Sequence, residues 1–523
     1  MTATTHRWRT RGLAALAGIA AGGLTLGVGE LVASLAVEPA AAPFLAVGNT
    51  FVDLTPEWLK SFAIRTFGEN DKLVLLAGMA VVLLVLSAAG GLLELWRRGA
   101  GVAVLVVLGG VAVAAATTRP TGTLTWALPT AAGVVAGAAA LTLLVGRLRP
   151  RAADADPTES GESASAARLP RRQVLLLTVA VAGLAVLTAA GGRRFGRTLA
   201  EVREARAALR LPAPPDPAPP LPAGVELDVS GMTPFTTPNR DFFRVDTALD
   251  LPRVMPEEWR LRIHGMVGRE IELTFDDVLA LDLVERMITL TCVSNEVGGE
   301  LAGNAVWLGY PLADLLTRAG PSPGADMLLS TSVDGFTAGT PLDVVMDGRD
   351  ALLAVGMNGE PLPVEHGFPA RLVVPGLYGY VSATKWVTDL ELTRFDRATA
   401  YWTDHGWAAK APIKTASRID VPGSFADLAA GRVVVAGVAW AQHRGISAVE
   451  VQVDDGDWRR AELAGEASAD TWRQWSWEWD AEPGNHTLRV RATDGAGELQ
   501  TDEQAPPFPD GSSGRHSVVV RVS

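Results

Sequence analysis

The sequence predicts a multi-domain protein with an N-terminal all-α transmembrane bundle, a central α+β domain and a C-terminal all-β sandwich of immunoglobulin type. Length is the first reason, because 523 residues are too many for a single core. Charge is the second: residues 1–222 hold 21 Lys or Arg against 14 Asp or Glu, whereas the remainder has a net charge of −19. Hydropathy is the third, since long apolar runs are confined to the first part and short alternating segments fill the second.

The domain boundaries are placed where the composition changes. Residues 1–196 are expected to form five transmembrane helices with a cytoplasmic loop at 147–172, and residues 197–224 a Pro-rich linker. A linker of this composition is a semi-rigid spacer, which would hold the following domain off the bilayer. Residues 225–398 are expected to form the α+β domain, because short strands with few helices fill this region. Residues 399–523 are expected to form the sandwich.

Five apolar runs support the transmembrane prediction, namely residues 12–37, 73–93, 101–117, 124–146 and 173–192. Most approach the roughly 20 residues that span a hydrocarbon core. The third is the shortest and fits a buried core helix as well, but its Gly and Ala content and the flanking Arg97, Arg98 and Arg119 favour a span. Glu94, at the end of the second run, is expected at the membrane interface.

Arginines between the runs set the orientation. If the runs alternate, the arginines before the first run, between the second and third, and between the fourth and fifth fall on one side, which should be cytoplasmic. Five crossings then place the residues after 192 outside, although Arg193, Arg194 and Arg197 count against this. We therefore expect a multi-pass protein of the cytoplasmic membrane, in contact with membrane lipid.

Cys292 is the only cysteine of the chain and stands in MITLTCVSNEVGGELAGNAVWLG, residues 287–309. A single cysteine serves packing, metal ligation or catalysis. Ile288, Leu290 and Cys292 alternate with Thr289 and Thr291 as in a half-buried strand, and the Ser, Asn and Gly residues that follow predict a loop. Taken alone, such a cysteine is best interpreted as a small buried hydrophobe. The motif around it favours another interpretation.

TCVSN at 291–295 and GNAVWLG at 303–309 resemble the molybdenum-binding segment of the sulfite oxidase superfamily of molybdopterin enzymes. Residues 350–386 are similar to that family's signature, with MNGEPLP, HGFP, R, VVPG and KW in order. The resemblance covers residues 232–523, and the apolar first part makes it the membrane-anchored bacterial type. It implies an enzyme, an oxidoreductase that uses a molybdenum–molybdopterin cofactor (Mo-MPT) for oxygen-atom transfer.

The resemblance also implies a set of site residues. Cys292 would supply the metal's protein ligand, a soft deprotonated sulfur. Arg244, Trp307 and Arg444 would meet the substrate. The residues implied for cofactor binding are Phe243, Arg244, Asp246, Asn295, Asp334, His366, Arg371 and Lys385. Asp246 departs from the family's pattern, which has a histidine there, and makes the pocket less positive. Taken singly, Arg244 fits a surface salt bridge and His366 a core histidine equally well.

The C-terminal region has short strands separated by turns such as Asp455-Gly456 and Asp494-Gly495, which is typical of an immunoglobulin-type sandwich. It resembles the family's dimerisation domain, which implies a homodimer through residues 399–523. Four tryptophans, Trp472, Trp475, Trp477 and Trp479, cluster along one predicted strand. We interpret them as a packing face or a dimer contact rather than as a cofactor site.

Absent motifs argue against several other classes. All seven histidines (His6, His264, His366, His405, His443, His486 and His516) lie outside the apolar runs, so a bis-histidine haem between these helices is not expected. The sequence has neither a Cys-x-x-Cys-His motif nor a Gly-rich dinucleotide loop after a strand. We therefore expect no haem, flavin or NAD, and no binding of nucleic acid, because the acidic second part has no basic stripe.

PRRQVLL at 170–176 opens the fifth run and resembles a twin-arginine (Tat) export signal, although it is internal. A plain positive-inside anchor is the alternative. A molybdopterin domain acquires its cofactor in the cytoplasm and crosses the membrane folded, which favours the export signal and an extracytoplasmic catalytic domain. Residues 154–167, rich in Ser, Ala and acid, are expected to be a disordered cytoplasmic loop.

The expected substrate pocket departs from the family's pattern. Sulfite oxidases surround the anion with several arginines and a tyrosine, whereas this chain has Glu296 and Val297 after Asn295, and Val355-Gly356 before the MNG element. We therefore expect the substrate to be a small oxo-anion or an S- or N-oxide, with sulfite a poor substrate and a neutral S-oxide or N-oxide the natural one. Sulfite oxidation is the first alternative, if arginines converge from other loops, and a non-catalytic binding protein is the second. The electron partner is expected to be an external carrier, either a cytochrome or quinone-linked.

Overall fold

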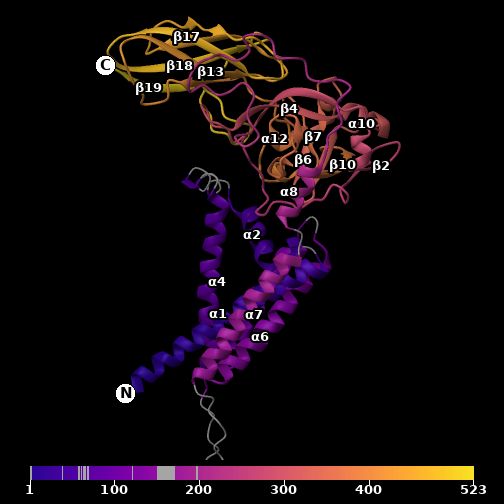
Figure 1. The fold of residues 1–523 in the computed structure, drawn as a ribbon, viewed down its shortest axis with the longest axis vertical. Coiled ribbons are helices and arrows are strands. Elements are labelled where there is room, and N and C mark those ends of the chain that lie inside the picture. Colours follow the sequence, from indigo (N-terminus) through magenta and orange to yellow (C-terminus); the bar gives the residue numbers. More distant parts are fainter. Residues whose placement is uncertain are drawn as a thin grey trace, which may run out of the picture. The chain divides into compact units, whose positions relative to one another are not determined.

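The computed structural model describes residues 3–37, 39–56, 59, 62, 66–67, 70–119, 122–149, 171–195 and 198–523. The predicted cytoplasmic loop at 154–167 lies outside these residues. The chain divides into two compact units, Met1–Leu199 with Ala248–Asp250, and Ala200–Thr247 with Leu251–Ser523. Both units are drawn in Figure 1.

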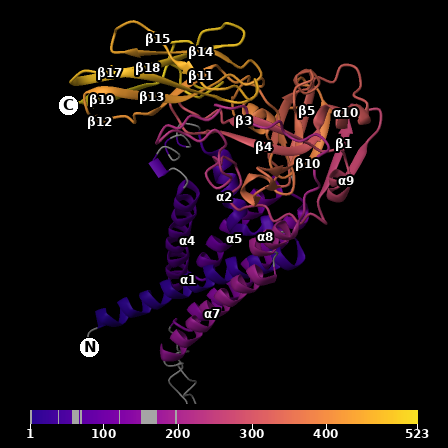
Figure 2. The same ribbon diagram turned by 45° about the horizontal axis from the view of Figure 1, so that its top comes forward.

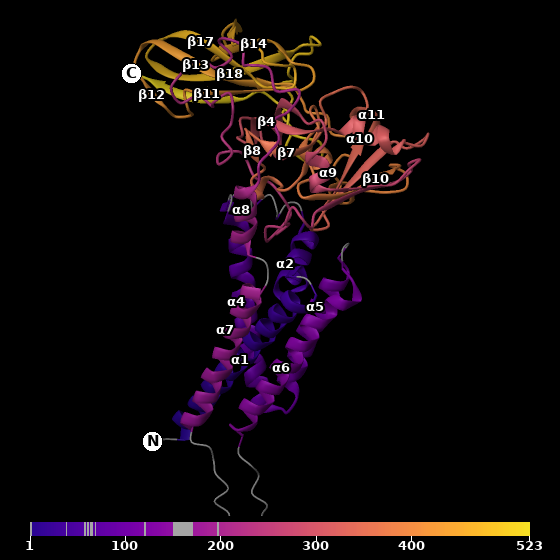
Figure 3. The same ribbon diagram turned by 45° about the vertical axis from the view of Figure 1, so that its right-hand side comes forward.

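The first unit is helical. Its elements are α1 (Ala3–Ala36), η1 (Pro39–Ala41), α2 (Pro43–Leu54), α4 (Asp71–Trp96), α5 (Ala100–Thr117), η3 (Leu124–Trp126), α6 (Ala127–Gly146) and α7 (Arg171–Phe195). Helix α1 packs against α4, α6 and α7, and α5 lies beside α6 (Figure 3). Among the described residues, five helical segments are long and apolar enough to cross a membrane, at Trp8–Ala36, Lys72–Trp96, Ala100–Thr117, Leu124–Gly146 and Arg172–Gly191. They coincide with the five predicted runs.

Glycines allow these helices to approach closely. A Cβ atom at Gly18 of α1 would lie 2.1 Å from the carbonyl oxygen of Ser87 in α4, and one at Gly91 would lie 2.0 Å from the carbonyl oxygen of Ala14. Both distances are far inside van der Waals contact. Small residues at such crossings bring the two helix backbones together. In lipid there is no hydrophobic driving force between helices, so van der Waals packing at these close contacts stabilises their association.

Glu94, near the end of the apolar segment Lys72–Trp96, is buried within the protein. Its carboxylate accepts hydrogen bonds from the backbone N–H groups of Gly99 and Gly101, each at 3.0 Å, and lies 3.8 Å from a guanidinium nitrogen of Arg149. The N-terminus of a helix leaves backbone donors unpaired, and an acid there satisfies them and complements the helix dipole. Glu94 therefore closes the turn between α4 and α5.

The segment predicted as a spacer instead packs on the second unit. Helix α8 (Leu199–Ala208) is followed by an extended Pro-rich stretch. The guanidinium of Arg206 donates to the carbonyl oxygens of Pro361 and Leu362, at 3.0 and 2.8 Å from Nε. Farther along, the carbonyl of Asp216 accepts from Glu285 N–H at 2.9 Å. The prolines leave their carbonyls free to accept, so the stretch binds along the domain surface.

The second unit begins with an α+β region. One sheet has the order β2-β1-β10-β5-β6, and the other has β3-β4-β7-β8 with β9 also paired to β7. The strands are β1 (Arg260–Gly265), β2 (Ile271–Thr274), β3 (Val284–Thr291), β4 (Ala302–Pro311), β5 (Met327–Ser332), β6 (Thr337–Pro341), β7 (Leu352–Met357), β8 (Glu360–Pro361), β9 (Arg371–Val373) and β10 (Val387–Thr393). The short helices are α9 (Phe275–Leu279), α10 (Leu312–Ala319), α11 (Leu342–Val345), η4 (Val364–His366), α12 (Gly379–Ser382) and α13 (Tyr401–Asp404).

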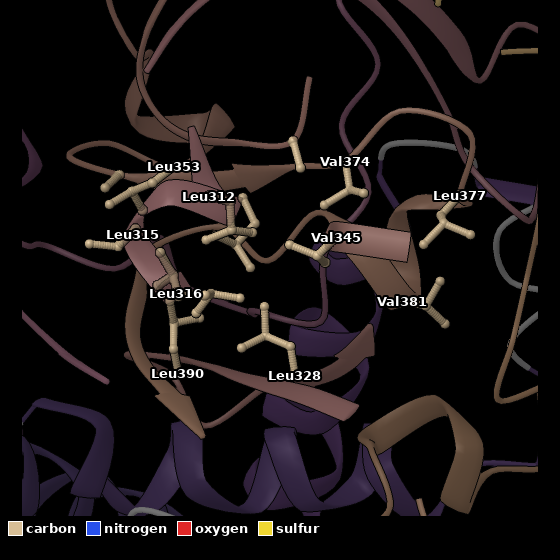
Figure 4. Packing of buried hydrophobic residues seen from close by; sticks show 14 of the residues in the cluster. Leu312, Leu315, Leu316, Leu328, Val345, Leu353, Val374, Leu377, Val381 and Leu390 are labelled. Atoms are coloured by element: carbon tan, nitrogen blue, oxygen red, sulfur yellow. The ribbon is translucent and has the colours of Figure 1, made fainter. Parts of the chain in front are cut away.

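A leucine-rich core joins the two sheets of this region. Leu312, Leu315 and Leu316 of α10 meet Leu328 of β5 and Leu353 of β7 (Figure 4), and all five are fully buried. Burying one such side chain contributes about 1.5–3 kcal/mol. The core therefore fixes the positions from which β3, β4 and β9 present the site residues.

The remaining strands form two stacked sheets (Figure 2), ordered β11-β13-β17-β16 and β12-β19-β18-β14-β15. They are β11 (Ala416–Val421), β12 (Asp427–Leu428), β13 (Gly431–Trp440), β14 (Ile446–Val453), β15 (Arg459–Arg460), β16 (Glu462–Leu463), β17 (Arg473–Ala481), β18 (Gly484–Asp494) and β19 (Ser517–Val522). Trp475 and Trp479 are buried between the sheets, Trp472 is buried in the core of the α+β region, and Trp477 is half-buried. The tryptophans thus serve packing.

Candidate functional site

Cys292 lies directly after β3, as predicted. Its backbone N–H donates to the Leu301 carbonyl at 2.9 Å, and this bond closes a loop of residues 293–300 before β4 begins. The strand is not half-buried, however, because Thr289 and Thr291 are buried as well. The Thr289 hydroxyl accepts from Trp472 N–H, and the Thr291 hydroxyl accepts from the Gln442 side chain. Residues of the sandwich therefore cover the face that the alternation assigned to solvent.

The surroundings of Cys292 keep a free thiol protonated. Burial raises the pKa of Cys292, and hydrogen bonds from the backbone N–H and the hydroxyl of Ser294 offset this only in part. A metal ion that binds the sulfur must therefore displace the proton. Ser294 then remains as a pair of donors to the thiolate, a role that sequence reasoning missed.

The loop after Cys292 is held from both sides. Within it, the Asn295 side-chain oxygen accepts from Leu301 N–H at 2.8 Å. From the sandwich, Ser512 donates to the Asn295 carbonyl at 2.5 Å, and Arg418 donates to the Gly299 carbonyl at 2.7 Å. The ring of His516 fills the space beside Gly298, where a Cβ atom would lie 2.2 Å from it. The sandwich thus fixes the loop that carries the thiol.

Arg371 is a buried cation without a carboxylate partner among the described residues. Its guanidinium donates to the carbonyls of His366 at 3.1 Å and Ala383 at 3.4 Å and stacks 5.1 Å from the Trp307 ring centre. Burial alone lowers the pKa of Arg371 to about 9. A buried cation that nothing neutralises is costly, so this position is suited to an anionic ligand.

Lys385, Asp246 and Arg244 form a connected charge cluster. The Lys385 ammonium lies 2.7 Å and Arg244 Nε 2.9 Å from the same Asp246 oxygen. Burial, opposed by Asp246, lowers the pKa of Lys385 to about 8. Asp246 therefore shares one negative charge between two cations, and the cluster has one positive charge left when Lys385 is protonated.

His366 holds the neighbouring segments together as a neutral ring. Burial and the nearby charge of Arg371 lower the pKa of His366 to about 4. Its Nε2 lies 3.1 Å from the Asn239 carbonyl, which can only accept, so Nε2 carries the proton. The ring also meets Phe242 edge to face at 5.5 Å. Phe242, which is buried and stacks on the predicted Phe243, is the aromatic that contacts the site core.

Each of the three residues expected to meet the substrate has a hydrogen-bond partner within the protein. Trp307 is fully buried, and its indole N–H donates to the Ile288 carbonyl at 3.1 Å, so it has no donor left for an anion. Arg444 donates from Nε to Asp494 at 2.9 Å and from Nη2 to the Ile413 carbonyl at 2.9 Å. Arg444 is thus an ion-paired residue of the sandwich, and Arg244 is paired with Asp246.

Asp334 lies in the turn between β5 and β6, where it accepts from Phe336 N–H at 3.2 Å. The preceding residue, Val333, donates its N–H to the Trp386 carbonyl, which brings this turn beside Lys385. Ser332 ends β5 there, and its hydroxyl is buried without a hydrogen-bond partner among the described residues. A buried hydroxyl without a partner at this place can donate to a ligand. Nothing in the sequence indicated this donor.

These residues fit a molybdopterin group. A buried soft sulfur suits the metal, and a buried guanidinium without a carboxylate partner among the described residues, an ammonium and a buried hydroxyl suit a phosphate tail.

Comparisons with known proteins agree with this chemistry. A family model described as "Oxidoreductase molybdopterin binding domain" matches residues 248–402. The chain is similar to mitochondrial sulfite oxidase of Mus musculus, with 29% identity over 322 residues that cover 52% of this chain and 58% of that protein. The chain therefore spans little more than half the length of this relative.

Two further proteins are similar over different extents. "Uncharacterized oxidoreductase YuiH" of Bacillus subtilis (strain 168) is 34% identical over 150 residues, which cover 29% of this chain and 72% of that protein. The solved structure of the sulfane dehydrogenase SoxCD from Paracoccus pantotrophus covers 56% of this chain and 84% of its own, with 24% identity and a TM-score of 0.48.

Proposed function

The chain belongs to the sulfite oxidase superfamily of molybdopterin oxidoreductases, and from this premise we propose that it transfers an oxygen atom to or from a small, neutral sulfur or nitrogen oxo-compound. The single observation that supports a neutral substrate is that the arginines expected to bind an anion are paired with carboxylates. Arg444 is neutralised by Asp494, and Arg244 shares Asp246 with Lys385. One expected anion donor, Arg444, is thus compensated by its own carboxylate, and Arg244 is compensated in part.

The cofactor, when bound, supplies the oxo group and the two-electron redox change. Cys292 completes the metal's coordination, and Ser294 stabilises the thiolate by hydrogen bonds. Arg371 and Lys385 would compensate the negative charge of the phosphate tail, and the turn at Asp334 would contribute to holding the pterin. In the reductive direction, an S-oxide, two electrons and two protons yield the sulfide and water. An external carrier, a cytochrome or quinone-linked, provides the electrons.

Sulfite oxidation is the second candidate, because the mammalian relatives with 28–29% identity are sulfite oxidases. Losing two charge-assisted hydrogen bonds, at about 1.5–3 kcal/mol each, would weaken binding of sulfite by about two orders of magnitude or more. A carboxylate lies beside each of the two arginines and would also repel an anion.

We expect the purified, molybdenum-loaded protein to reduce dimethyl sulfoxide with a reduced dye more efficiently than it oxidises sulfite with an artificial acceptor. Steady-state kcat/KM for the two reactions measures this. A sulfite KM in the low micromolar range would establish ordinary sulfite oxidation instead. Protein that binds no molybdenum after expression with cofactor supply would support a non-catalytic binding protein.

For localisation, the proposal is a multi-pass protein of the cytoplasmic membrane with the catalytic domain outside. The five apolar helices and the asymmetry of the arginines support it. The C-terminal two-sheet region is proposed to be an immunoglobulin-type sandwich that forms a homodimer, which light scattering of the detergent-solubilised protein tests.

The paired arginines at the start of α7 make a narrower prediction. If they form a Tat signal, Arg171→Lys with Arg172→Lys keeps the positive charge but should leave the catalytic domain in the cytoplasm. Protease accessibility in spheroplasts and reporter fusions after Arg210 measure its location. Unchanged export of an active domain would show that the arginines are a plain positive-inside anchor.

A further inference from the structure

Tyr378 is a buried tyrosine whose hydroxyl hydrogen has no acceptor among the described residues. The side chain is only 5% exposed. Its oxygen accepts a long hydrogen bond from Lys414 N–H at 3.5 Å, but no described residue accepts from its O–H. Tyr380, two residues on, differs in this respect, because its hydroxyl donates to the Ala408 carbonyl at 2.6 Å. Buried hydroxyls normally find an acceptor, so the unused donor at Tyr378 requires an explanation.

The position of Tyr378 brings this donor to the Cys292 loop. It directly precedes α12, where a Cβ atom at Gly379 would lie 4.0 Å from the Thr291 carbonyl, the residue before Cys292. The hydroxyl end lies against Gly511, where a Cβ atom would be 2.6 Å from the phenol oxygen. The next residue, Ser512, is the one that donates to Asn295 of the loop. The phenol therefore lies between the cysteine strand and the sandwich loop that holds the thiol.

The backbone fixes the ring in this place. Tyr378 N–H donates to the Ala411 carbonyl at 2.9 Å, and the Ser382 hydroxyl donates to the Tyr378 carbonyl at 3.0 Å. Burial raises the pKa of Tyr378 to about 12, and the charges of Asp510 and Cys292 act in the same direction. The phenol thus stays neutral and protonated, and it remains a donor throughout the pH range in which the protein would work.

We propose that Tyr378 is a substrate-binding residue that donates its hydroxyl hydrogen to the oxygen atom of the oxo-substrate held beside Cys292. A neutral donor suits a neutral S-oxide or N-oxide, whose oxygen carries a partial negative charge, and costs no buried charge when the substrate leaves. The inference rests on the proposed function, because it requires that an oxo-compound reacts next to the Cys292 thiolate.

The test compares Tyr378→Phe with Tyr380→Phe, a matched control in the same segment whose hydroxyl is already bonded. Dimethyl sulfoxide is titrated into the molybdenum-loaded protein, and binding is read from the visible thiolate-to-metal absorption, together with steady-state kcat and KM. We expect Tyr378→Phe to raise the Kd and KM for dimethyl sulfoxide by about tenfold, the loss of one hydrogen bond. Tyr380→Phe should leave both within about twofold. A Tyr378→Phe protein with unchanged Kd and KM would overturn the inference.

Two further outcomes separate this inference from the proposed function. If the wild-type protein oxidises sulfite and ignores dimethyl sulfoxide, the proposed substrate is wrong, and the same variants are then measured with sulfite. A rise in the sulfite KM of Tyr378→Phe supports the tyrosine's role, and an unchanged value overturns it. If Tyr378→Phe alone loses molybdenum, as measured by elemental analysis, the tyrosine holds the cofactor loop rather than the substrate, which also overturns the inference.

Discussion

A Cys292→Ser variant should lose turnover by at least about a thousandfold, equivalent to about 4 kcal/mol of activation free energy, while remaining folded. Serine fills nearly the same buried space after β3 and keeps the backbone bond to Leu301. Its hydroxyl is a harder ligand that does not deprotonate at neutral pH, so it cannot replace the thiolate on the metal. The pterin should be retained, because Arg371 and Lys385, the residues proposed to hold its tail, are unchanged in this variant.

Three measurements test these expectations. They are the turnover of dimethyl sulfoxide and of sulfite, the molybdenum content by elemental analysis, and the released pterin by fluorescence. Ser294→Ala is the matched control, since it removes one donor to the sulfur but leaves the ligand itself. It should reduce turnover far less than Cys292→Ser. Near-normal rates for Cys292→Ser in a molybdenum-replete preparation would show that Cys292 is only a packing residue.

An Arg371→Met variant should lose most of its pterin, with an affinity about 10–100-fold lower, because one charge-assisted contact to an anion is worth about 1.5–3 kcal/mol. Methionine fills the apolar part of the space beside Trp307 but supplies no charge. The pterin affinity of Arg371→Lys should lie between those of the wild type and Arg371→Met. Lysine keeps the charge but lacks the planar guanidinium that reaches both the His366 and Ala383 carbonyls.

Arg349→Met is the control for Arg371. Arg349 is also largely buried in the same region, but Asp347 neutralises it at 2.6 Å. Pterin content should be close to wild type in this variant. Released pterin is quantified by fluorescence against protein concentration. Equal pterin in Arg371→Met and the wild type would show that the buried guanidinium does not bind the cofactor.

Much of the local architecture could be predicted from the sequence, because it is encoded by patterns within single segments. Continuous apolar runs predict the five long helices, and the alternation from Ile288 to Cys292 predicts a strand that ends at the thiol. The signature at residues 350–386 predicts that His366, Arg371 and Lys385 belong to one site. In the structure η4, β9 and the turn before β10 bring these three residues close to one another.

The features that were missed depend on contacts distant in sequence. Nothing near Arg444 indicates that Asp494 pairs with it, and nothing near Thr289 and Thr291 indicates that the sandwich covers them. The Pro-rich segment was predicted to be a spacer from its composition. Its attachment depends on Arg206 finding two carbonyls about 155 residues later, which composition does not encode.

The residues of the sandwich that support the cysteine loop are synthesised long after the loop itself. Arg418, Ser512 and His516 bind a loop that begins at Val293, so more than 200 residues separate the thiol from the last of its supports. While a ribosome is still making the sandwich, Cys292 sits on a loop that lacks these restraints. A cofactor delivered at that moment would meet a thiol not yet fixed in place. We therefore expect the cofactor to be loaded only after residue 516 has emerged, when all three supports of the loop can form.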